Sequence, residues 1–150
     1  YADCVPILLA SPGARAVAAV HAGWRGIVAG VLPAAVARLA SLAQSAPAAL
    51  VAAIGPCIAR DAFEIGPKMI DTFVKTIDPQ PPLRRADTGK GFIDLRESTR
   101  RQLVSAGLRP DLIDTTDQCT FANRAEFFSH RRDGPATGRM AALIAPRGKR

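Results

Sequence analysis

The sequence predicts a single α+β domain, a layered sandwich of mixed β-sheets and helices. The chain has 150 residues, the size of one domain with a full hydrophobic core. Apolar residues make up 48% of it and charged residues 22%, the usual balance of a globular protein. Short apolar runs typical of strands and longer runs with helical spacing are mixed along the whole chain, without an internal repeat.

The first predicted elements form a β-hairpin. The run VPILLA (Val5–Ala10) predicts a buried strand, the Ser-Pro-Gly sequence at 11–13 predicts a turn, and Ala16–Val20 predicts the returning strand. Pairing these strands brings Cys4 and His21 to the same end of the hairpin. We therefore expect the two side chains to approach each other.

A helix is predicted over Ile27–Ala43. Its apolar residues keep the spacing of three to four that gives one buried face, and Pro33 marks its first turn. The glycine-rich turn at 23–26 before it offers backbone N–H groups to an anion. The apolar positions are Val28, Val31, Leu32, Ala35, Val36 and Leu39.

The remaining elements are shorter. A capping box places a helix start at Asp94, with Glu97 three residues later, and the helix ends near Ala106 at Gly107. Further predictions are strands at 50–54, 63–65, 112–116 and 139–145, a helix at 67–76, a loop at 78–91, and an irregular stretch at 117–138 with a helical turn near 125–128.

The basic charge does not indicate a nucleic-acid partner. The net charge is +7 and the isoelectric point is near 10.2, values that would suit a nucleic-acid surface if the charges were gathered. The basic residues are instead scattered over 84–85, 96–101, 131–132 and 147–150, without interleaved aromatic residues. A basic cleft for a small phosphate-bearing or anionic substrate remains open.

Cysteine usage and hydropathy predict a cytoplasmic protein. Cys4, Cys57 and Cys119 are too few and too widely spaced for a disulfide framework or a CxxC zinc knuckle, which favours reduced thiols. No apolar run reaches the roughly 18 residues of a membrane span, and no signal peptide pattern opens the chain, so no membrane partner is expected. Because Tyr1 stands directly before a buried strand, we expect that an upstream part of the protein is missing.

Cys4 and His21 are the Cys–His pair with a geometric reason to meet. Such a pair suits nucleophilic catalysis, in which the imidazole activates a thiolate, or metal binding, in which both groups are ligands of zinc or copper. Two ligands are too few for a tetrahedral zinc site, so a third would come from elsewhere. The residues alone also allow Cys4 to be a small buried hydrophobe and His21 a satisfied residue at a strand end.

Seven segments, in this order, resemble the laccase-domain family. Its members are named multicopper polyphenol oxidases, purine nucleoside phosphorylases or a peptidoglycan editing factor. The resemblance runs from Ala2 to about Ile144, and the combination of ADC, HAGWRG and a terminal RRD…TGRMA is specific. The segments are ADCVPILL, AAVHAGWRG, AAIGPCI, FEIG, DLRESTRRQL, DQCTF and FFSHRRDGPATGRMAALI.

The resemblance implies a His–Cys–His metal site with Cys4 and His21 as catalytic metal ligands. The other histidine belongs to a segment upstream of ADC that this chain lacks. The resemblance further implies a zinc-dependent enzyme, with copper as the alternative metal. Its substrates would be a purine nucleoside and phosphate, converted to the free base and ribose 1-phosphate, and it could also deaminate adenosine.

Two neighbouring residues are candidates for substrate binding. Arg25 could bind phosphate or ribose oxygens through its guanidinium, or form a salt bridge at the start of the helix. Asp3 could accept a hydrogen bond from a ligand or from the His21 ring, or cap a turn.

Three other functions stay open from the sequence. Copper-dependent oxidation of phenols needs more histidines than the two of this chain. A metal-free hydrolase would use Cys4 and His21 directly, consistent with editing of cell-wall precursors. A binding module with a vestigial site would bind a metal or a partner without catalysis. The sequence predicts neither the preferred nucleoside nor the oligomeric state.

Overall fold

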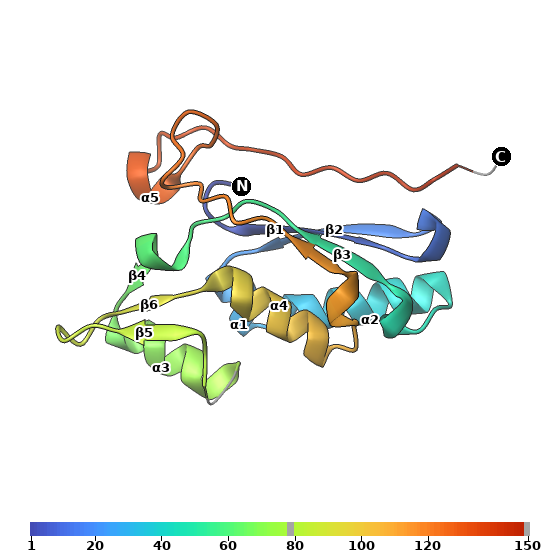
Figure 1. The fold of residues 1–150 in the computed structure, drawn as a ribbon, viewed down its shortest axis with the longest axis horizontal. Helices are drawn as coiled ribbons and strands as arrows, with labels where there is room; N and C mark the ends of the chain where they lie inside the picture. Colours follow the sequence, from blue (N-terminus) through green and yellow to red (C-terminus); the bar gives the residue numbers. More distant parts are fainter. Residues whose placement is uncertain (78–79, 149–150) are drawn as a thin grey trace.

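A four-stranded mixed sheet forms the centre of the computed structural model, which describes residues 1–77 and 80–148. Its strands are β1 (Val5–Ala10), β2 (Val17–Ala22), β3 (Val51–Ile54) and β7 (Ile113–Thr115). They lie in the order β2-β1-β3-β7 (Figure 1). β1 is antiparallel to both neighbours, and β3 is parallel to β7. The hairpin and the strands predicted at 50–54 and 112–116 are confirmed. Their ends agree with the prediction to within one residue, except that β2 continues to Ala22 rather than Val20.

Helices cover one face of this sheet (Figure 1). They are α1 (Trp24–Val28), α2 (Val31–Ala43) and α4 (Leu95–Ser105). Alternation along β1 turns Val5, Ile7 and Leu9 toward the helices, and all three are fully buried. The helix residues in the same core are each at most 2% exposed: Ile27, Leu32, Val36, Leu39, Leu95 and Leu103. The predicted α+β fold class is confirmed.

The helix predicted over Ile27–Ala43 is wrong in one respect, because it is two helices. Gly30 has φ +77°, the left-handed conformation that interrupts a right-handed helix. α1 therefore ends at Val28, two residues before Gly30, and α2 begins at Val31. Pro33 lies in the first turn of α2, as predicted.

A smaller antiparallel sheet lies beyond α1, together with a further helix (Figure 1). Its elements are β4 (Glu64–Ile65), α3 (Pro67–Thr76), β5 (Leu83–Arg85) and β6 (Gly91–Ile93). The predictions of a strand near 63–65 and a helix at 67–76 are confirmed. The prediction of a loop at 78–91 is wrong at β5, because this segment pairs with β6 through backbone hydrogen bonds. The amino-acid composition of the segment does not indicate such a pairing. Residues 78 and 79 of that loop, like 149 and 150 of the basic tail, lie outside the described residues.

α4 begins with half of the predicted capping box. The Asp94 carboxylate accepts a hydrogen bond from the Glu97 backbone N–H at 2.9 Å. The Glu97 carboxylate does not return it, because the Asp94 N–H donates to the carbonyl of Pro82 at 2.9 Å. Glu97 instead accepts hydrogen bonds from Arg100 at 2.8 Å and Arg101 at 2.9 Å. These bonds, chiefly the one from Arg100, hold the pKa of Glu97 below its ordinary value.

Glu97→Gln is expected to lower the free energy of unfolding by about 0.5–1 kcal/mol at neutral pH, because it removes the charge from two partly exposed ion pairs. A carboxylate whose pKa is depressed by folding stabilises the protein above its unfolded pKa of about 4.3. The difference between variant and wild type should therefore vanish as the pH falls through the folded pKa. Urea denaturation at pH 7 and pH 3 measures both values. Glu126→Gln, at an exposed position, is the control and should change little; an equal loss for both would contradict the assignment.

The strand predicted at 139–145 is wrong. This segment runs extended along the face of the main sheet opposite the helices, and no strand among the described residues pairs with it (Figure 1). Tyr1 and Met140 exchange two backbone hydrogen bonds of 2.7 and 2.8 Å, and Arg147 N–H donates to Ala14 at 2.8 Å. Strand-like composition alone is not enough, because a strand needs a neighbour to satisfy its backbone groups.

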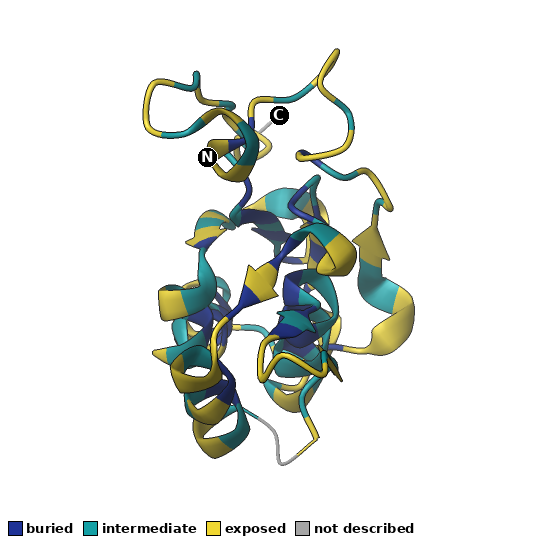
Figure 2. Cartoon of the chain, turned by 90° about the vertical axis from the view of Figure 1, so that its left-hand side faces the viewer, coloured by how far each residue is buried: buried dark blue, intermediate teal, exposed yellow. Residues whose placement is uncertain are grey.

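The stretch before this segment is irregular, as predicted, but it also contains the unpredicted helix α5 (His130–Asp133). A turn closes at 3.1 Å between the Phe127 N–H and the Asn123 carbonyl, close to the predicted helical turn. Figure 2 shows that this part of the molecule is largely exposed or half-buried.

The structure also has single 3-10 turns at Pro12–Ala14, Pro47–Ala49, Arg60–Ala62 and Pro110–Leu112. Among the described residues, no helix combines the length and the apolar character of a membrane span.

Candidate metal centre

Cys4 and His21 lie on neighbouring strands at the same end of the main sheet. The register pairs Val5 with Ala22 and Pro6 with His21, so Cys4 stands opposite Gly23. Val5 and Ala22 are fully buried toward the helices. Strand alternation therefore turns Cys4 and His21 toward the other face, in diagonal positions that long side chains can bridge. The prediction that the hairpin brings these two residues to the same end is confirmed. That their side chains approach each other stays a prediction.

The Cys4 thiol lies directly against the backbone of Gly23. A Cβ atom placed on Gly23 would be only 2.9 Å from the Cys4 sulfur, closer than real carbon–sulfur contacts. Cys4 is half-buried, and burial is the main cause that raises the pKa of its thiol, followed by the negative charge of Asp3. The N-terminal amino group acts in the opposite direction.

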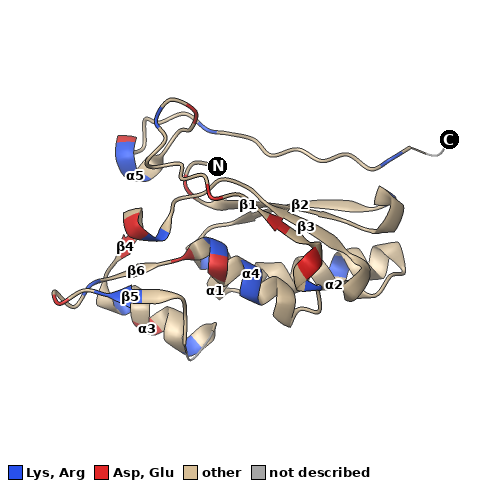
Figure 3. Cartoon of the chain, in the orientation of Figure 1, with Lys and Arg blue, Asp and Glu red and all other residues tan. Residues whose placement is uncertain are grey.

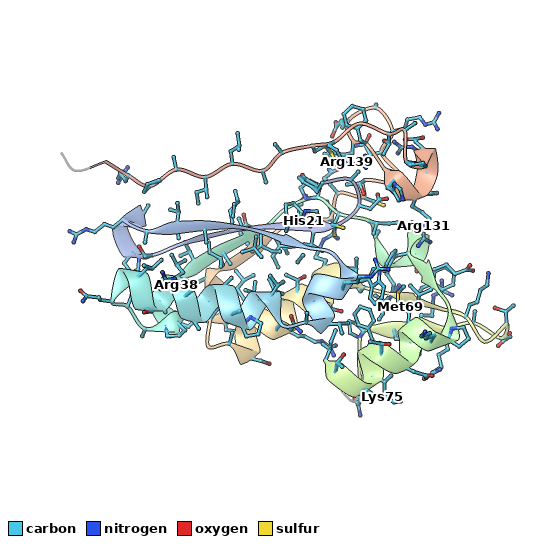
Figure 4. All side chains as sticks on the ribbon, turned by 180° about the vertical axis from the view of Figure 1, so that it is seen from behind. His21, Arg38, Met69, Lys75, Arg131 and Arg139 are labelled. Carbon is cyan, nitrogen blue, oxygen red and sulfur yellow. The ribbon has the colours of Figure 1, made fainter. Side chains whose placement is uncertain are left out.

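His21 is exposed and lines a cavity of about 210 Å³ between the sheet and the C-terminal segment. Tyr1, Pro6, Leu8 and Met140 are among the other lining residues. Figure 4 shows His21 on the sheet, below the loops that carry Arg139. The imidazole is thus accessible to a ligand on the same face that Cys4 faces.

Asp3 is almost fully buried at 8% exposure, and both of its carboxylate oxygens accept hydrogen bonds within the protein. Oδ1 accepts one from the Thr120 hydroxyl at 2.7 Å. Oδ2 accepts one from the Ser129 hydroxyl at 3.1 Å and one from the Arg131 backbone N–H at 2.7 Å. None of the ion pairs among the described residues involves Asp3. The prediction that Asp3 binds substrate stays a prediction, and these contacts favour a role inside the protein.

Arg25 lies at the start of α1 with its guanidinium 4.5 Å from the centre of the Trp24 ring. The side chain is exposed, and within the described part of the chain it forms no ion pair that would support the salt-bridge alternative. Its donors are available to an anion, and the stacking on Trp24 limits the orientations of the guanidinium.

The other two cysteines are structural. Cys57 is fully buried, and burial raises the pKa of its thiol to about 11. Cys119 pairs with it in an isolated β-bridge, and its sulfur accepts hydrogen bonds from Ala59 and Ala122 backbone N–H groups at 3.3 and 3.4 Å. Cys57 is thus buried as the sequence interpretation held, while Cys119 is only half-buried, with its sulfur engaged by backbone groups.

Sequence reasoning missed Gly23, Thr120 and Ser129 as parts of this site. Gly23 belongs to HAGWRG, where the sequence predicted only a turn that offers N–H groups to an anion. Thr120 belongs to DQCTF and Ser129 to FFSH, two segments of the family resemblance in which no role was predicted for these residues. The local signal is weak: Thr120 precedes Phe121 and Ser129 follows Phe128, so each is a small polar residue beside an aromatic one. Their partner Asp3 is more than a hundred positions away, which no local pattern reveals.

Two donors fit a metal, but they do not complete a site. Thiolate and imidazole are the ligands that zinc and copper favour, and Cys4 and His21 face the same accessible side. Among the described residues, no group of three or more His, Cys, Asp and Glu side chains could hold an ion. The prediction that this chain has two of three ligands stays a prediction.

Residues 1–147 match the family described as multi-copper polyphenol oxidoreductase laccase. The chain belongs to this family. The laccase-family resemblance found in the sequence segments is thus confirmed over nearly the whole chain.

Similar proteins of this laccase family carry two kinds of names. The chain is 38% identical over 149 residues to "Purine nucleoside phosphorylase YlmD" of Geobacillus stearothermophilus, covering 98% of this chain and 54% of that protein. It is 38% identical over 140 residues to "Adenosine deaminase RL5" of an unknown prokaryotic organism, covering 92% and 53%. The crystal structure of YlmD from Geobacillus stearothermophilus superimposes with a TM-score of 0.86 at 36% identity, covering 92% of this chain and 52% of that one. The chain thus spans about half the length of these relatives.

Proposed function

We propose that this chain is part of a purine nucleoside phosphorylase and contributes Cys4 and His21 to its metal site. The reaction converts a purine nucleoside and phosphate to the free base and ribose 1-phosphate. The observation that carries the proposal is the placement of Cys4 and His21 on one sheet face, in a chain that is 38% identical over 98% of its length to a protein of that name.

Zinc is the metal we propose, with copper as the alternative. Cys4 and His21 would hold it through the thiolate sulfur and an imidazole nitrogen, which is a donor set that suits both ions. When bound, the ion acts as a Lewis acid that stabilises developing negative charge.

Arg25 is the residue that we propose for phosphate binding. Its exposed guanidinium offers parallel N–H donors that match two phosphate oxygens. Because Trp24 holds the guanidinium at 4.5 Å, less side-chain freedom is lost when the anion binds. Its positive charge, which no ion pair among the described residues neutralises, would attract phosphate.

The third ligand would come from a part of the protein outside this chain. The relatives are about twice as long as the region they share with it. The face of the sheet that carries His21 is also incompletely covered: cavities of about 330 and 540 Å³ lie along it, and Leu143 in the segment above is 85% exposed. Residues 140–146 of this segment carry no charge, and Figure 3 shows most of the C-terminal segment uncharged, so this face suits an apolar covering layer.

The cytoplasm is the compartment we propose. All three cysteines are free in the structure, although the backbones of Cys57 and Cys119 lie side by side in a β-bridge. Free thiols persist in a reducing compartment.

Adenosine deamination is the second candidate function. It is favoured by the 38% identity to the protein named adenosine deaminase RL5. Copper oxidation of phenols has less support, because the chain has only two histidines. A metal-free hydrolase would pair Cys4 with His21, and no hydrogen bond joins them within the described part of the chain.

Chromatographic product analysis of the full-length protein with adenosine, with and without phosphate, tests both candidates. Adenine and ribose 1-phosphate that appear only with phosphate would support the phosphorylase. Inosine and ammonia in either case would support the deaminase. Intact adenosine, inosine and methylthioadenosine despite a bound metal would contradict both and favour a binding module. Metal analysis of the same sample distinguishes zinc from copper and from the metal-free hydrolase.

A further inference from the structure

Asp3 is a buried carboxylate in an unusual backbone conformation. Its φ is +86°, in the left-handed region that side chains other than Asn and Asp rarely adopt. Such a conformation costs about 1–3 kcal/mol and persists only where the surroundings hold it. Here its surroundings hold the residue at both ends: the carboxylate accepts three hydrogen bonds, and the Asp3 carbonyl accepts one from the Ile58 N–H at 3.0 Å.

The carboxylate joins segments that are far apart in the sequence. Thr120 and Ser129 are fully buried, and Ser129 is the N-cap of α5, where its hydroxyl also accepts from the Arg132 N–H at 3.2 Å. Arg132 in turn donates to the Thr120 carbonyl at 2.9 Å. Asp3, which directly precedes Cys4, therefore anchors the loop from Thr120 to α5.

A purely structural role is a poor explanation for this arrangement. Burying a carboxyl group costs desolvation free energy, and hydrogen bonds from hydroxyl and amide groups compensate only part of that cost. An apolar residue at position 3 would avoid the desolvation, but it would adopt the left-handed φ less readily than Asp. What the arrangement does achieve is a fixed direction for the chain at Cys4, whose sulfur then lies against Gly23 on the face of His21.

We propose that Asp3 is a positioning residue, whose hydrogen-bonded carboxylate and left-handed backbone hold the Cys4 sulfur on the side of the sheet that His21 faces. It acts through Cys4 and does not contact the substrate. The inference rests on the proposed function, since it gives Cys4 the role of a metal ligand.

The test compares Asp3→Ala, Asp3→Asn and Ser98→Ala in the full-length protein. Ser98 is a matched control, because its fully buried hydroxyl also donates a hydrogen bond, to the Asp94 carbonyl at 2.7 Å, away from the site. Zinc affinity is measured by competition with a chelator, and cobalt substitution reports the thiolate-to-metal charge-transfer band. The rate at which iodoacetamide labels Cys4 in the metal-free protein is followed by mass spectrometry.

Asp3→Ala is expected to weaken zinc binding about ten- to a hundredfold, the usual effect of removing a partner that orients a ligand. It should also shift the cobalt band and speed Cys4 labelling. Asp3→Asn should recover part of the affinity, because its amide oxygen still accepts one hydrogen bond and Asn tolerates positive φ. Ser98→Ala should leave all three readouts unchanged.

Unchanged zinc affinity and an unchanged cobalt band in folded Asp3→Ala would overturn the inference, as would equal losses in Ser98→Ala. If the wild type binds no metal, the proposed function fails instead. The labelling rate then decides alone: faster Cys4 labelling in Asp3→Ala than in Ser98→Ala supports positioning, and equal rates overturn it.

Discussion

Cys4→Ala and His21→Ala are each expected to lower kcat/KM for phosphorolysis of adenosine at least about a hundredfold. Partners that merely orient a metal ligand contribute about ten- to a hundredfold, so loss of a ligand itself should cost no less. The effect should appear in kcat, because the ion stabilises charge that develops in the transition state. Steady-state kinetics of the full-length variants, with metal content determined for each preparation, measures it.

Cys119→Ala is the matched control for the thiol. Cys119 is also half-buried, but its sulfur accepts only backbone hydrogen bonds from Ala59 and Ala122. It should retain metal and activity, with a modest loss of stability. Activity within a factor of two of wild type in Cys4→Ala, at full metal content, would show that Cys4 is not a ligand.

The sequence predicted the parts of the site that depend on local patterns. Pairing of the two apolar runs around the turn at 11–13 requires only neighbouring residues, so the register that gathers Cys4 and His21 followed from them. The N-cap at Asp94 was equally local. The break between α1 and α2 was not predicted, since a glycine such as Gly30 can also lie within a helix, and its φ of +77° appears only in the structure.

The parts that the sequence did not reveal depend on distant partners. β5 has little apolar character, and it is a strand because β6 offers backbone groups to it. The segment 139–145 shows the converse, because its apolar residues suit a strand but no neighbour among the described residues pairs with it. The contacts of Asp3 with Thr120 and Ser129 span 117 and 126 positions, and only the folded chain brings them together.

Gly23→Ala is expected to reduce zinc affinity and kcat/KM at least about tenfold while the protein stays folded. Gly23 has φ −75° and ψ 169°, an extended conformation that alanine adopts without strain. The cost therefore comes from the new methyl group, which would lie 2.9 Å from the Cys4 sulfur and must push it away. Chelator competition measures the affinity, and thermal unfolding confirms the fold.

Gly66→Ala provides a control with the same backbone. Gly66 is the N-cap of α3 with φ −84° and ψ 168°, and no atom lies within 4 Å of a Cβ placed on it. Both variants change the N-cap propensity and the entropy of the unfolded chain alike, so any difference between them reports the contact with the sulfur. In a Cys4→Ala background that difference should vanish, because the atom that the methyl group displaces is gone. A loss that persists in the double variant would mean that Gly23 acts on the site through His21 or the start of α1 rather than through the thiol.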